Sequence, residues 1–568
     1  MSIVASATER AKSEEPLSLT IQSLPDIPPL TVEVARAAFP DGNRYMKMRD
    51  ELGVFYADED FSACYAVRGQ PGIAPWRLSL VLLFQFVEGL SDEQAVQAVA
   101  SRIDWKYALS LDLKETGFDG SVLSEFRSRL LEHEREGLLL DRMLERFQEA
   151  GYLKARGSQR TDSTHVLAAV RAVNRLVLVG ETLRAALNEV ATEAGEWLKP
   201  QIQPGWLERY ERRFDDYRLP KGQEERQALA AEIGADGRHL LQAIFTAEYA
   251  STLSALPSVR ILHRIWWQQY QAVEGGQAMR WRSEKELPPS AQRLHSPYDT
   301  DARYGSKRTT AWLGYKAHLT ETCDEDTPHV IIHVLTTPAT TPDFDAPPQI
   351  YADLAEKNLL PAEHLLDAGY VDAGLLVESQ AQHQVTVIGP VAQDHCWQAL
   401  TPDAFPLARF VIDWQAQQVT CPQGHPSQKW SQTHDKHDNP IINIRFSPTA
   451  CAACHVRQQC TRAEEGPRHL TLRPQPQHEA LQALRSFQTT PEFKALYDDR
   501  SGIEGTISQA VRCNELRRSR YLGLPKTHLH HLLSAAALNL CRVIAWLSGH
   551  LPALTRTSSF ARLALAGT

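Results

Sequence analysis

Between residues 309 and 388 the chain alternates strand-type and helix-type segments, and this order most constrains the fold. Thr309–Glu321 alternates apolar and polar side chains, and His329–Leu335 is a short, almost continuously apolar run typical of a buried strand. The following segments are predicted as a helix, a strand, a helix and a strand: Ala346–Lys357, His364–Leu366, Ala373–Gln382 and Val385–Ile388. Strands that alternate with helices in this way are typical of an α/β fold.

Two long insertions interrupt this order. Residues 171–290 are rich in Ala, Leu, Glu and Arg with helical periodicity, most clearly at Glu181–Leu198 and Glu224–Ala247, which predicts a helical insertion. Its large aromatic side chains are expected to pack in a core rather than to stack on bases: Trp197, Trp206, Tyr210, Trp266 and Trp267. A second insertion follows the last predicted strand and contains the grouped cysteines Cys421, Cys451, Cys454 and Cys460.

An all-helical unit is predicted at the N-terminal side, over residues 30–150. Its predicted helices are Pro75–Gly89, Asp92–Ile103 and Val122–Ala150, the second opened by a capping box at Ser91 and the third by an N-cap at Ser121. Short helices joined by tight turns are typical of helix-turn-helix DNA readers, but also of any small bundle. Arg127 and Arg129 are the candidate DNA contacts if the first interpretation holds.

Three acidic residues stand in contexts that suit metal-dependent phosphoryl transfer. Asp162 lies within Gly157–Val170, which is predicted to be extended, and Asp367 directly follows the apolar strand that ends at Leu366. A carboxylate at the C-terminal end of a strand lies where α/β sheets bind ligands. Glu504 follows Tyr497 and Arg500 at helical spacings of three and four, so these three side chains are expected on one helix face.

The chemistry of phosphodiester cleavage explains why such residues would be brought together. Two divalent cations about 3.5–4 Å apart can activate the attacking oxygen and stabilise the leaving one. Mg²⁺ prefers oxygen ligands and keeps several waters, so a few carboxylates from separate elements are sufficient. An arginine on the same face can hold phosphate oxygens bidentately while the glutamate binds metal.

The spacing of Tyr497, Arg500 and Glu504 resembles the signature around the catalytic glutamate of bacterial insertion-sequence DDE transposases. The chain as a whole resembles the insertion-sequence family numbered 1182, related to the families numbered 4 and 5. The resemblance rests on these segments: Arg160–His165, Asn174–Asn188, Ser296–Thr322 with Gly314–His318, Glu363–Asp372 and Gly502–Leu524. One position departs from the family signature, which has a lysine seven residues after the glutamate, where this chain has Val511 followed by Arg512.

This resemblance implies a ribonuclease-H-like catalytic core that cuts DNA at the inverted-repeat ends of an element and joins them to target DNA. Asp162, Asp367 and Glu504 would hold two Mg²⁺ or Mn²⁺ ions, and Tyr497 and Arg500 would position the phosphate. Such enzymes work as synapsed dimers, so a homodimer on DNA is expected. Two alternatives stay open: a non-catalytic repressor derived from a transposase, and a nuclease that cleaves without joining.

The overall charge does not by itself indicate a nucleic-acid partner. The formal net charge is −9 and the isoelectric point is near 6.2, whereas phosphate binding usually gives a basic balance. Residues 505–530 are locally basic, with five Lys or Arg and a single acid, Glu515, and His528, His530 and His531 follow the last of these basic residues. The candidate contacts to the DNA backbone are Arg512, Arg517, Arg518, Arg520 and Lys526.

Four cysteines of the second insertion predict a structural Zn²⁺ site. Thiolate quartets in cytosolic proteins are more often zinc ligands than disulfides. Unligated thiols and redox chemistry remain alternatives, and His425 or His455 could replace one ligand. The predicted ligands are Cys421, Cys451, Cys454 and Cys460.

These predictions divide the chain into seven parts. Met1–Pro16 has no apolar stretch of signal-peptide type, and Leu532–Leu547 is interrupted by Asn539 and Arg542, so a cytoplasmic, nucleoid-associated protein is expected. The parts are a flexible N-terminus (1–29), a helical DNA-binding domain (30–150), the first part of the core (151–170 and 296–395), the helical insertion (171–295), the cysteine-rich insertion (396–475), the core completion with the Glu504 helix and basic segment (476–550) and a tail (551–568).

Overall fold

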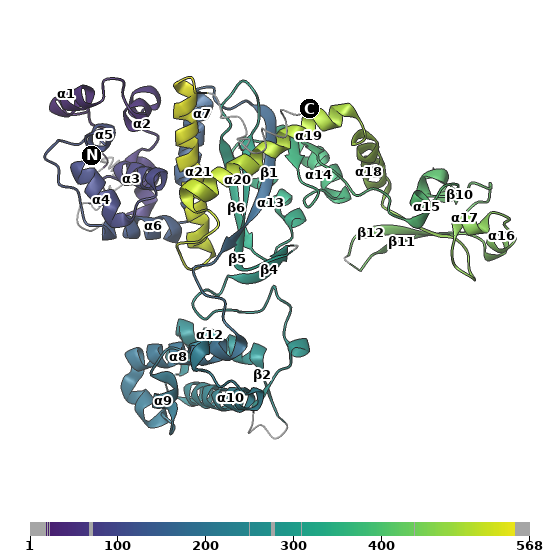
Figure 1. The fold of residues 1–568 in the computed structure, drawn as a ribbon, viewed down its shortest axis with the longest axis horizontal. Helices are drawn as coiled ribbons and strands as arrows, with labels where there is room; N and C mark the ends of the chain where they lie inside the picture. Colours follow the sequence, from purple (N-terminus) through teal and green to yellow (C-terminus); the bar gives the residue numbers. More distant parts are fainter. Residues whose placement is uncertain are drawn as a thin grey trace, which may run out of the picture.

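A central sheet with helices on both faces joins three smaller units in this protein (Figure 1). The computed structural model describes residues 19, 21, 23–66, 72–248, 250–273, 279–307, 309–436 and 438–550. Most of the predicted flexible N-terminus (1–29) and all of the predicted tail (551–568) lie outside these residues. In this part of the chain the architecture is mixed α/β, as the sequence predicts.

The sheet has six strands, and β1 lies at its centre. Antiparallel pairing joins β1 to β5, which in turn pairs with β4 and β6, while parallel pairing joins β1 to β7 and β7 to β8. The strands are β1 (Arg156–Leu167), β4 (Arg303–Lys307), β5 (Thr310–Thr322), β6 (Ile331–Pro338), β7 (Pro361–Leu366) and β8 (Thr386–Ile388). Thr161 of β1 is in register with Leu366 of β7. The residues that follow these two in the sequence, Asp162 and Asp367, therefore lie side by side.

Four helices of the core fix the sheet in place: α13 (Ala346–Glu356), α14 (Ala373–His383), α20 (Gly502–Asn514) and α21 (Leu524–Leu547). The helix α21 contacts β6 and also two helices of the N-terminal unit, α3 (Pro75–Glu88) and α7 (Leu138–Glu149). Its polar interruption at Asn539 is buried and bonds Ile331 in both directions, since the Ile331 N–H donates to Asn539 Oδ1 and Asn539 Nδ2 donates to the Ile331 carbonyl, each at 2.7 Å. None of the described helices combines the length and the apolar character that crossing a membrane requires.

The N-terminal unit is helical, as predicted, but one predicted helix is divided. Its elements are α1 (Pro29–Ala38), α2 (Arg44–Lys47), η1 (Met48–Leu52), η2 (Asp58–Cys64), α3 (Pro75–Glu88), α4 (Asp92–Ser101), α5 (Ile103–Ala108), α6 (Ser121–Glu132) and α7 (Leu138–Glu149). The capping box is present, with Ser91 Oγ accepting from Gln94 N–H at 3.2 Å and Gln94 Oε1 accepting from Ser91 N–H at 2.9 Å. The predicted helix Val122–Ala150 breaks because Glu134 adopts a φ of 54°, a left-handed conformation that ends α6.

The first insertion folds as a separate helical unit below the sheet in Figure 1. It contains α8 (Arg175–Leu198), η3 (Lys199–Gln201), α9 (Trp206–Tyr210), η4 (Asp216–Arg218), α10 (Gln223–Thr246), α11 (Ala250–Ala255), α12 (Pro257–Gln269), β2 (Tyr270–Ala272), β3 (Met279–Trp281) and η5 (Glu284–Glu286). Trp206, Tyr210 and Trp266 are buried in its own core, as predicted. Trp197 packs against that core, whereas Trp267 is 67% exposed and therefore does not belong to it.

The cysteine-rich insertion forms a small unit with its own apolar core and lies apart from the central sheet (Figure 1). It contains α15 (Trp397–Leu400), η7 (Leu407–Arg409), β9 (Val411–Asp413), β10 (Gln418–Thr420), β11 (Lys429–His434), β12 (Pro440–Arg445), α16 (Pro448–Ala452), α17 (Arg457–Cys460) and β13 (His469–Leu472). The chain then returns to the core through α18 (Gln475–Phe487), α19 (Pro491–Asp498) and η8 (Asp499–Ser501). Both insertions leave and re-enter the core without interrupting the pairing of its strands.

Buried histidines make the fold sensitive to acid. Burial lowers the pKa of His528 and of His530 to about 4, and it lowers the pKa of His364, which bonds Thr161 and Tyr351, to about 3. In the unfolded chain these imidazoles regain a pKa near 6.5 and take up protons that the folded chain excludes.

We therefore expect the free energy of unfolding to fall as the pH drops below about 6.5, by about 2 kcal/mol for each such histidine between about pH 7 and pH 5. Thermal unfolding followed by circular dichroism across this range measures the loss. His530→Phe should flatten the dependence, because His530 lies among the rings of Phe86, Tyr521 and His531, where phenylalanine fits. An unchanged pH dependence in this variant contradicts the assignment.

Candidate functional site

Two carboxylates meet where β1 and β7 run in parallel. The Asp162 side chain is only 14% exposed, and its Oδ1 accepts from the Ser163 N–H at 2.7 Å. Asp367 directly follows β7, and its Oδ1 accepts from the Ala368 N–H at 2.7 Å. Burial raises the pKa of Asp162, and the neighbouring Asp367 charge adds to this rise, although Arg500 opposes it. The two acids therefore share one electrostatic environment.

Arg500 links this pair to the third predicted acid. Its Nη2 lies 2.6 Å from Asp162 Oδ2, and its Nη1 lies 3.2 Å from Glu504 Oε1. Burial by itself would lower the pKa of Arg500, but the charges of Asp162, Asp367 and Glu504 outweigh burial, and the pKa is raised. The guanidinium thus lies among three carboxylates as their counter-charge.

Tyr497 lies at the same site. Its ring stacks on Phe493 with centroids 5.4 Å apart, and burial raises the pKa of its hydroxyl, with Asp367, Asp162 and Glu504 adding to the rise. The three side chains do not share one continuous helix, although the sequence predicts one. Tyr497 lies at the end of α19, Arg500 in the short turn η8 and Glu504 in the first turn of α20. Consecutive turns still bring the three side chains together. Asp498 and Asp499, which lie between Tyr497 and Arg500, are exposed.

A cleft of about 330 Å³ lies beside the carboxylates, and Asp162, Glu504, Val511, Arg512 and Arg517 are among its lining residues. Arg517 donates from Nε to Thr164 Oγ1 at 2.8 Å, two residues beyond Asp162. Arg512 therefore shares the cleft wall with Val511, the position where the related signature has lysine. A nucleic-acid strand that enters this cleft would contact two arginine and two carboxylate side chains.

The rest of the basic segment lies beside the end of β1. The Leu167 N–H donates to the Arg517 carbonyl at 2.8 Å, and the Ser519 N–H donates to the Leu167 carbonyl at 2.9 Å, so this segment extends the sheet edge. Arg518, Arg520 and Lys526 are exposed. The three histidines that follow in the sequence do not extend this basic surface, because His530 and His531 are fully buried and burial lowers the pKa of His528.

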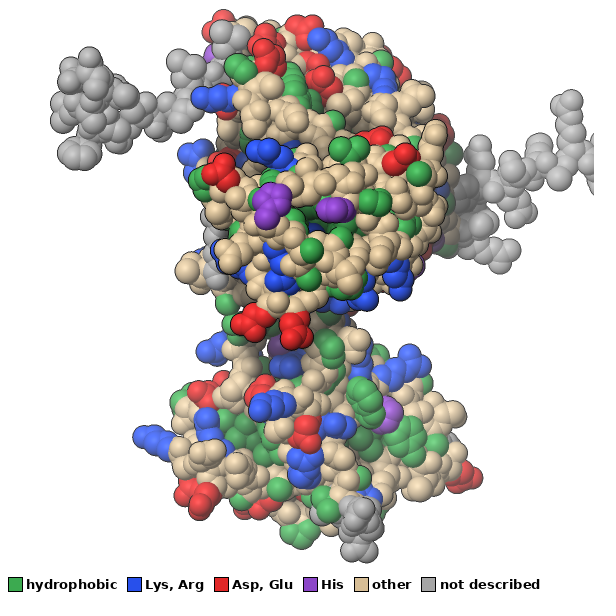
Figure 2. All heavy atoms as spheres, turned by 90° about the vertical axis from the view of Figure 1, so that its right-hand side faces the viewer, with side chains coloured by type: hydrophobic (Ala, Val, Ile, Leu, Met, Phe, Trp, Pro, Cys, Tyr) green, Lys and Arg blue, Asp and Glu red, His purple; other side chains and the backbone are tan. Residues whose placement is uncertain are grey.

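Two of the candidate DNA contacts in the N-terminal unit already have protein partners. Arg127 is 7% exposed and its Nη2 lies 2.6 Å from Asp92 Oδ2, so it ties α6 to α4 and is not available at the surface. Arg129 lies 3.7 Å from Glu125 and stacks over the Tyr65 ring. On the face shown in Figure 2, Lys and Arg side chains are interspersed with Asp and Glu side chains, and a narrow waist separates the helical insertion from the main body.

Three residues beside the carboxylates were not predicted from the sequence. Asp343 accepts from Ser163 Oγ at 3.3 Å and pairs with Lys316 at 2.9 Å and with Lys307 at 3.2 Å. Burial opposes ionisation of Asp343, yet the two lysines lower its pKa. Lys316 lies in the segment Gly314–His318 that carries part of the family resemblance, so that segment could have flagged it. Lys307 and Asp343 have no comparable local signal.

The four predicted zinc ligands face one another in the cysteine-rich unit. Cys421, Cys451, Cys454 and Cys460 line a single cavity together with His425. Burial raises the pKa of Cys460 to about 11, and the other three thiols contribute to the rise. In the described ranges no group of three or more His, Cys, Asp or Glu side chains is placed to hold a metal ion, and this holds for the four cysteines as well as for Asp162, Asp367 and Glu504.

Comparison with protein families adds evidence for both ends of the chain. A family model described as a transposase DDE domain matches residues 420–544, and one described as a transposase domain (DUF772) matches residues 33–129. These two matches support a DDE transposase. The DDE match includes Glu504 and most of α21, and the second match covers most of the N-terminal helical unit. No curated protein and no solved structure matches the chain.

The turn that carries Glu504 makes a testable contrast between two glycines. A Cβ at Gly502 would overlap the guanidinium of Arg160, whereas a Cβ at Gly505 would meet open space. We expect Gly502→Ala to cost about 1–3 kcal/mol of folding stability by overpacking and to displace α20 from β1. Gly505→Ala should stabilise the helix by up to about 1 kcal/mol.

Thermal unfolding of both variants measures this difference, and the two changes add the same methyl group to the same helix. Equal thermal midpoints for Gly502→Ala and Gly505→Ala would mean that Arg160 does not pack on this turn.

Proposed function

We propose that this protein is an insertion-sequence DDE transposase, related to the family numbered 1182, which cuts DNA at the ends of its element and joins them to target DNA. The observation that carries the proposal is the convergence of Asp162, Asp367 and Glu504 around Arg500 at one edge of the sheet. The two transposase family matches support the same assignment.

The donor set suits Mg²⁺ or Mn²⁺, since all three side chains offer carboxylate oxygens. Asp162, Asp367 and Glu504 would hold two ions. When bound, these ions supply charge that activates the attacking oxygen and stabilises the leaving oxygen. Arg500 already lies on this cluster, and its guanidinium can turn to a phosphate oxygen when cations neutralise the acids.

The remaining residues of the site would hold DNA in place. Tyr497 and Arg500 would orient the reacting phosphate, and Arg512 and Arg517 would hold the neighbouring backbone in the cleft beside Glu504. Arg518 and Arg520 continue this basic edge and would bind phosphates further along the strand. DNA in this cleft would exclude water from it, which would strengthen these charge interactions.

The order of strands and helices supports a ribonuclease-H-like core. The strands run β6, β5, β1, β7, β8 across the sheet, antiparallel on one side of β1 and parallel on the other, and α20 with Glu504 contacts β1. The N-terminal helical unit would read the inverted repeats, and the protein would act in the cytoplasm on nucleoid DNA. A homodimer would hold two element ends together.

The cysteine-rich unit is proposed to bind one structural Zn²⁺ through Cys421, Cys451, Cys454 and Cys460. Four thiols on one cavity are the chemistry that tetrahedral zinc requires, and the unit has a small apolar core of its own that a metal would reinforce. A four-thiolate site leaves no position for substrate, so this zinc would stabilise the unit and take no part in cleavage.

Glu504→Gln tests the catalytic assignment, because it removes the carboxylate charge and keeps the side-chain size. We expect Mg²⁺-dependent nicking of a labelled duplex that carries the element end to fall by at least about a hundredfold, as for loss of one group in an electrostatic site. Glu492→Gln, an exposed acid in the first turn of α19, is the matched control and should cut at the wild-type rate. Unchanged nicking by Glu504→Gln would falsify the assignment.

The products of the same assay separate the alternatives. A transposase gives cut ends followed by a product joined to target DNA, whereas a nuclease gives cut ends alone. A repressor derived from a transposase binds the end and leaves it uncut both with Mg²⁺ and with EDTA.

The zinc assignment predicts that Cys454→Ser lowers the metal content of the purified protein from about one zinc per chain towards zero and lowers the thermal midpoint. Cys396 is an exposed cysteine of the same insertion that does not line the cavity, so Cys396→Ser should retain the full metal content. Elemental analysis of both variants gives the result, and a metal-free wild-type protein would rule out the zinc site.

A further inference from the structure

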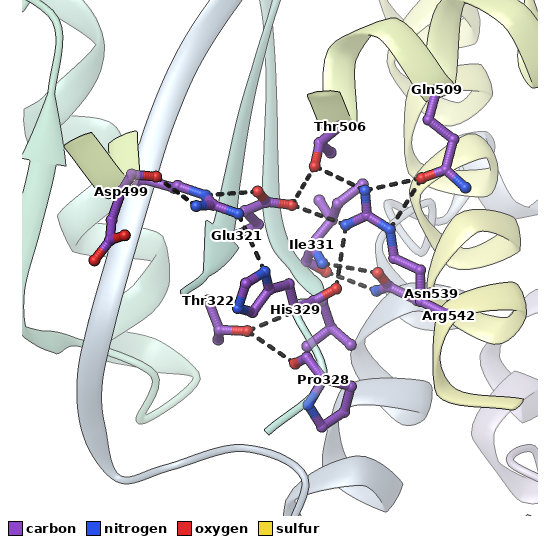
Figure 3. Close-up of polar contacts among 12 residues, drawn as sticks. Glu321, Thr322, Pro328, His329, Ile331, Asp499, Thr506, Gln509, Asn539 and Arg542 are labelled. Atoms are coloured by element: carbon purple, nitrogen blue, oxygen red, sulfur yellow. Dashed lines mark hydrogen bonds and ion pairs between the residues drawn. The ribbon is translucent and has the colours of Figure 1, made fainter. Parts of the chain in front are cut away.

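A fully buried carboxylate lies behind the candidate active site. Glu321 is on β5 with no exposed surface, and three side chains donate to it. Arg160 Nε lies 2.7 Å from Oε1, while Arg542 Nη1 at 2.8 Å and Thr506 Oγ1 at 2.6 Å share Oε2 (Figure 3). We call Arg160, Glu321, Thr506 and Arg542 the Glu321 cluster.

The members of this cluster lie on both sides of the predicted catalytic residues. Arg160 precedes Asp162 by two residues on β1, and its Nη1 donates to the carbonyl of Asp499, next to Arg500. The same guanidinium packs against Gly502, where an added Cβ would overlap it. Thr506 follows Glu504 by two residues on α20. The cluster therefore contacts the segment that carries Arg500 and Glu504 at both ends, at Asp499 through Arg160 and at Thr506 through Glu321.

Arg542 extends these contacts to α21. Its guanidinium donates to Thr506 Oγ1 at 2.7 Å, to Gln509 Oε1 at 2.9 Å and to the His329 carbonyl at 3.1 Å. Figure 3 shows Glu321, Thr506, Gln509 and Arg542 joined in one continuous set of contacts between the sheet and the two helices. A strand from the sheet and two helices of the core are thus fixed to one another through a single carboxylate.

The exposure of Glu504 makes this support necessary. Its side chain is 65% exposed and pairs with Arg500 at 3.2 Å, so its place relative to Asp162 depends on where the backbone of α20 lies. The preceding turn η8 separates α19 from α20, so the helical register does not continue unbroken from Tyr497. Buried ionic groups add little net stability, yet a fully bonded set permits one arrangement of its partners.

We propose that the Glu321 cluster positions Glu504 and Arg500 against Asp162. This inference rests on the proposed transposase function and adds Glu321, Arg160, Thr506 and Arg542 as positioning residues. They touch neither DNA nor metal, and they act through the backbone of residues 499–506. Loss of one contact loosens that turn, so that binding a divalent cation must first restore the turn's position.

Thr506 offers the sharpest test, because two substitutions differ in the hydroxyl. Thr506→Val keeps the shape and removes the donor to Glu321, whereas Thr506→Ser keeps the donor. We expect Thr506→Val to raise amide hydrogen exchange over residues 499–507 about fivefold without metal or DNA, and to raise the Mg²⁺ concentration for half-maximal cleavage about fivefold, which is the size of one hydrogen bond. Thr506→Ser should stay within about twofold of wild type.

Asp299→Asn is the matched control for stability. Asp299 is 1% exposed and accepts from Tyr315 Oη and from the Asp301 and Ala302 N–H groups, and none of these partners belongs to η8 or α20. It should lower the thermal midpoint without changing exchange over 499–507 or the Mg²⁺ dependence. Equal effects of Asp299→Asn and Thr506→Val on both readouts would show a merely structural role and overturn the inference.

The two readouts separate failure of this inference from failure of the proposed function. Exchange over residues 499–507 is measured without DNA, metal or cleavage, so it reports on the cluster even if the wild-type protein does not cut. Normal cleavage with unchanged exchange and Mg²⁺ dependence in Thr506→Val overturns the positioning role and leaves the transposase proposal intact. Glu321→Gln should show both effects more strongly, since it removes the charge that both arginines share.

Discussion

The parallel pairing of β1 with β7 is the constraint on which the candidate site depends. Because Thr161 is in register with Leu366, the next residues lie side by side: Asp162 within β1 and Asp367 just beyond the end of β7. A one-residue slip would turn one carboxylate to the other face. Antiparallel pairing with β5 holds β1 from its other side, so this register is fixed twice. The two acids are thereby held close even though their mutual charge opposes it.

Arg500 resolves the electrostatic cost of this arrangement. Asp162 is mostly buried beside Asp367, and a buried carboxylate needs a counter-charge. The Arg500 guanidinium bonds Asp162 and reaches Glu504, which brings the third acid to the pair. The same turn is held from behind by Arg160, whose charge is balanced by Glu321. Residues 499–504 are therefore held by two arginines. Arg500 bonds the acids on the cleft side, and Arg160 bonds the backbone of this turn from the core side.

The insertions are compatible with this core because each of them folds around a hydrophobic core of its own. The helical unit packs around its own apolar cluster, and the cysteine-rich unit packs around a smaller one. Long insertions between core elements add little closure entropy, because that term grows slowly with loop length. The sheet can therefore keep the register of β1, β5 and β7 although residues from distant parts of the chain form it.

The sequence by itself determined the elements whose signal is local. Periodicity located β5, α13, α14 and the insertion helices, and the capping box located α4. Local context and the family resemblance pointed to Asp162, Asp367 and Glu504 as candidates. Only the tertiary structure decided that Arg127 is buried against Asp92, that the predicted Val122–Ala150 helix divides at Glu134, and that Asp343 and Glu321 lie beside the site. These features depend on contacts between residues that are distant in the sequence, and the local sequence pattern around each residue does not indicate such contacts.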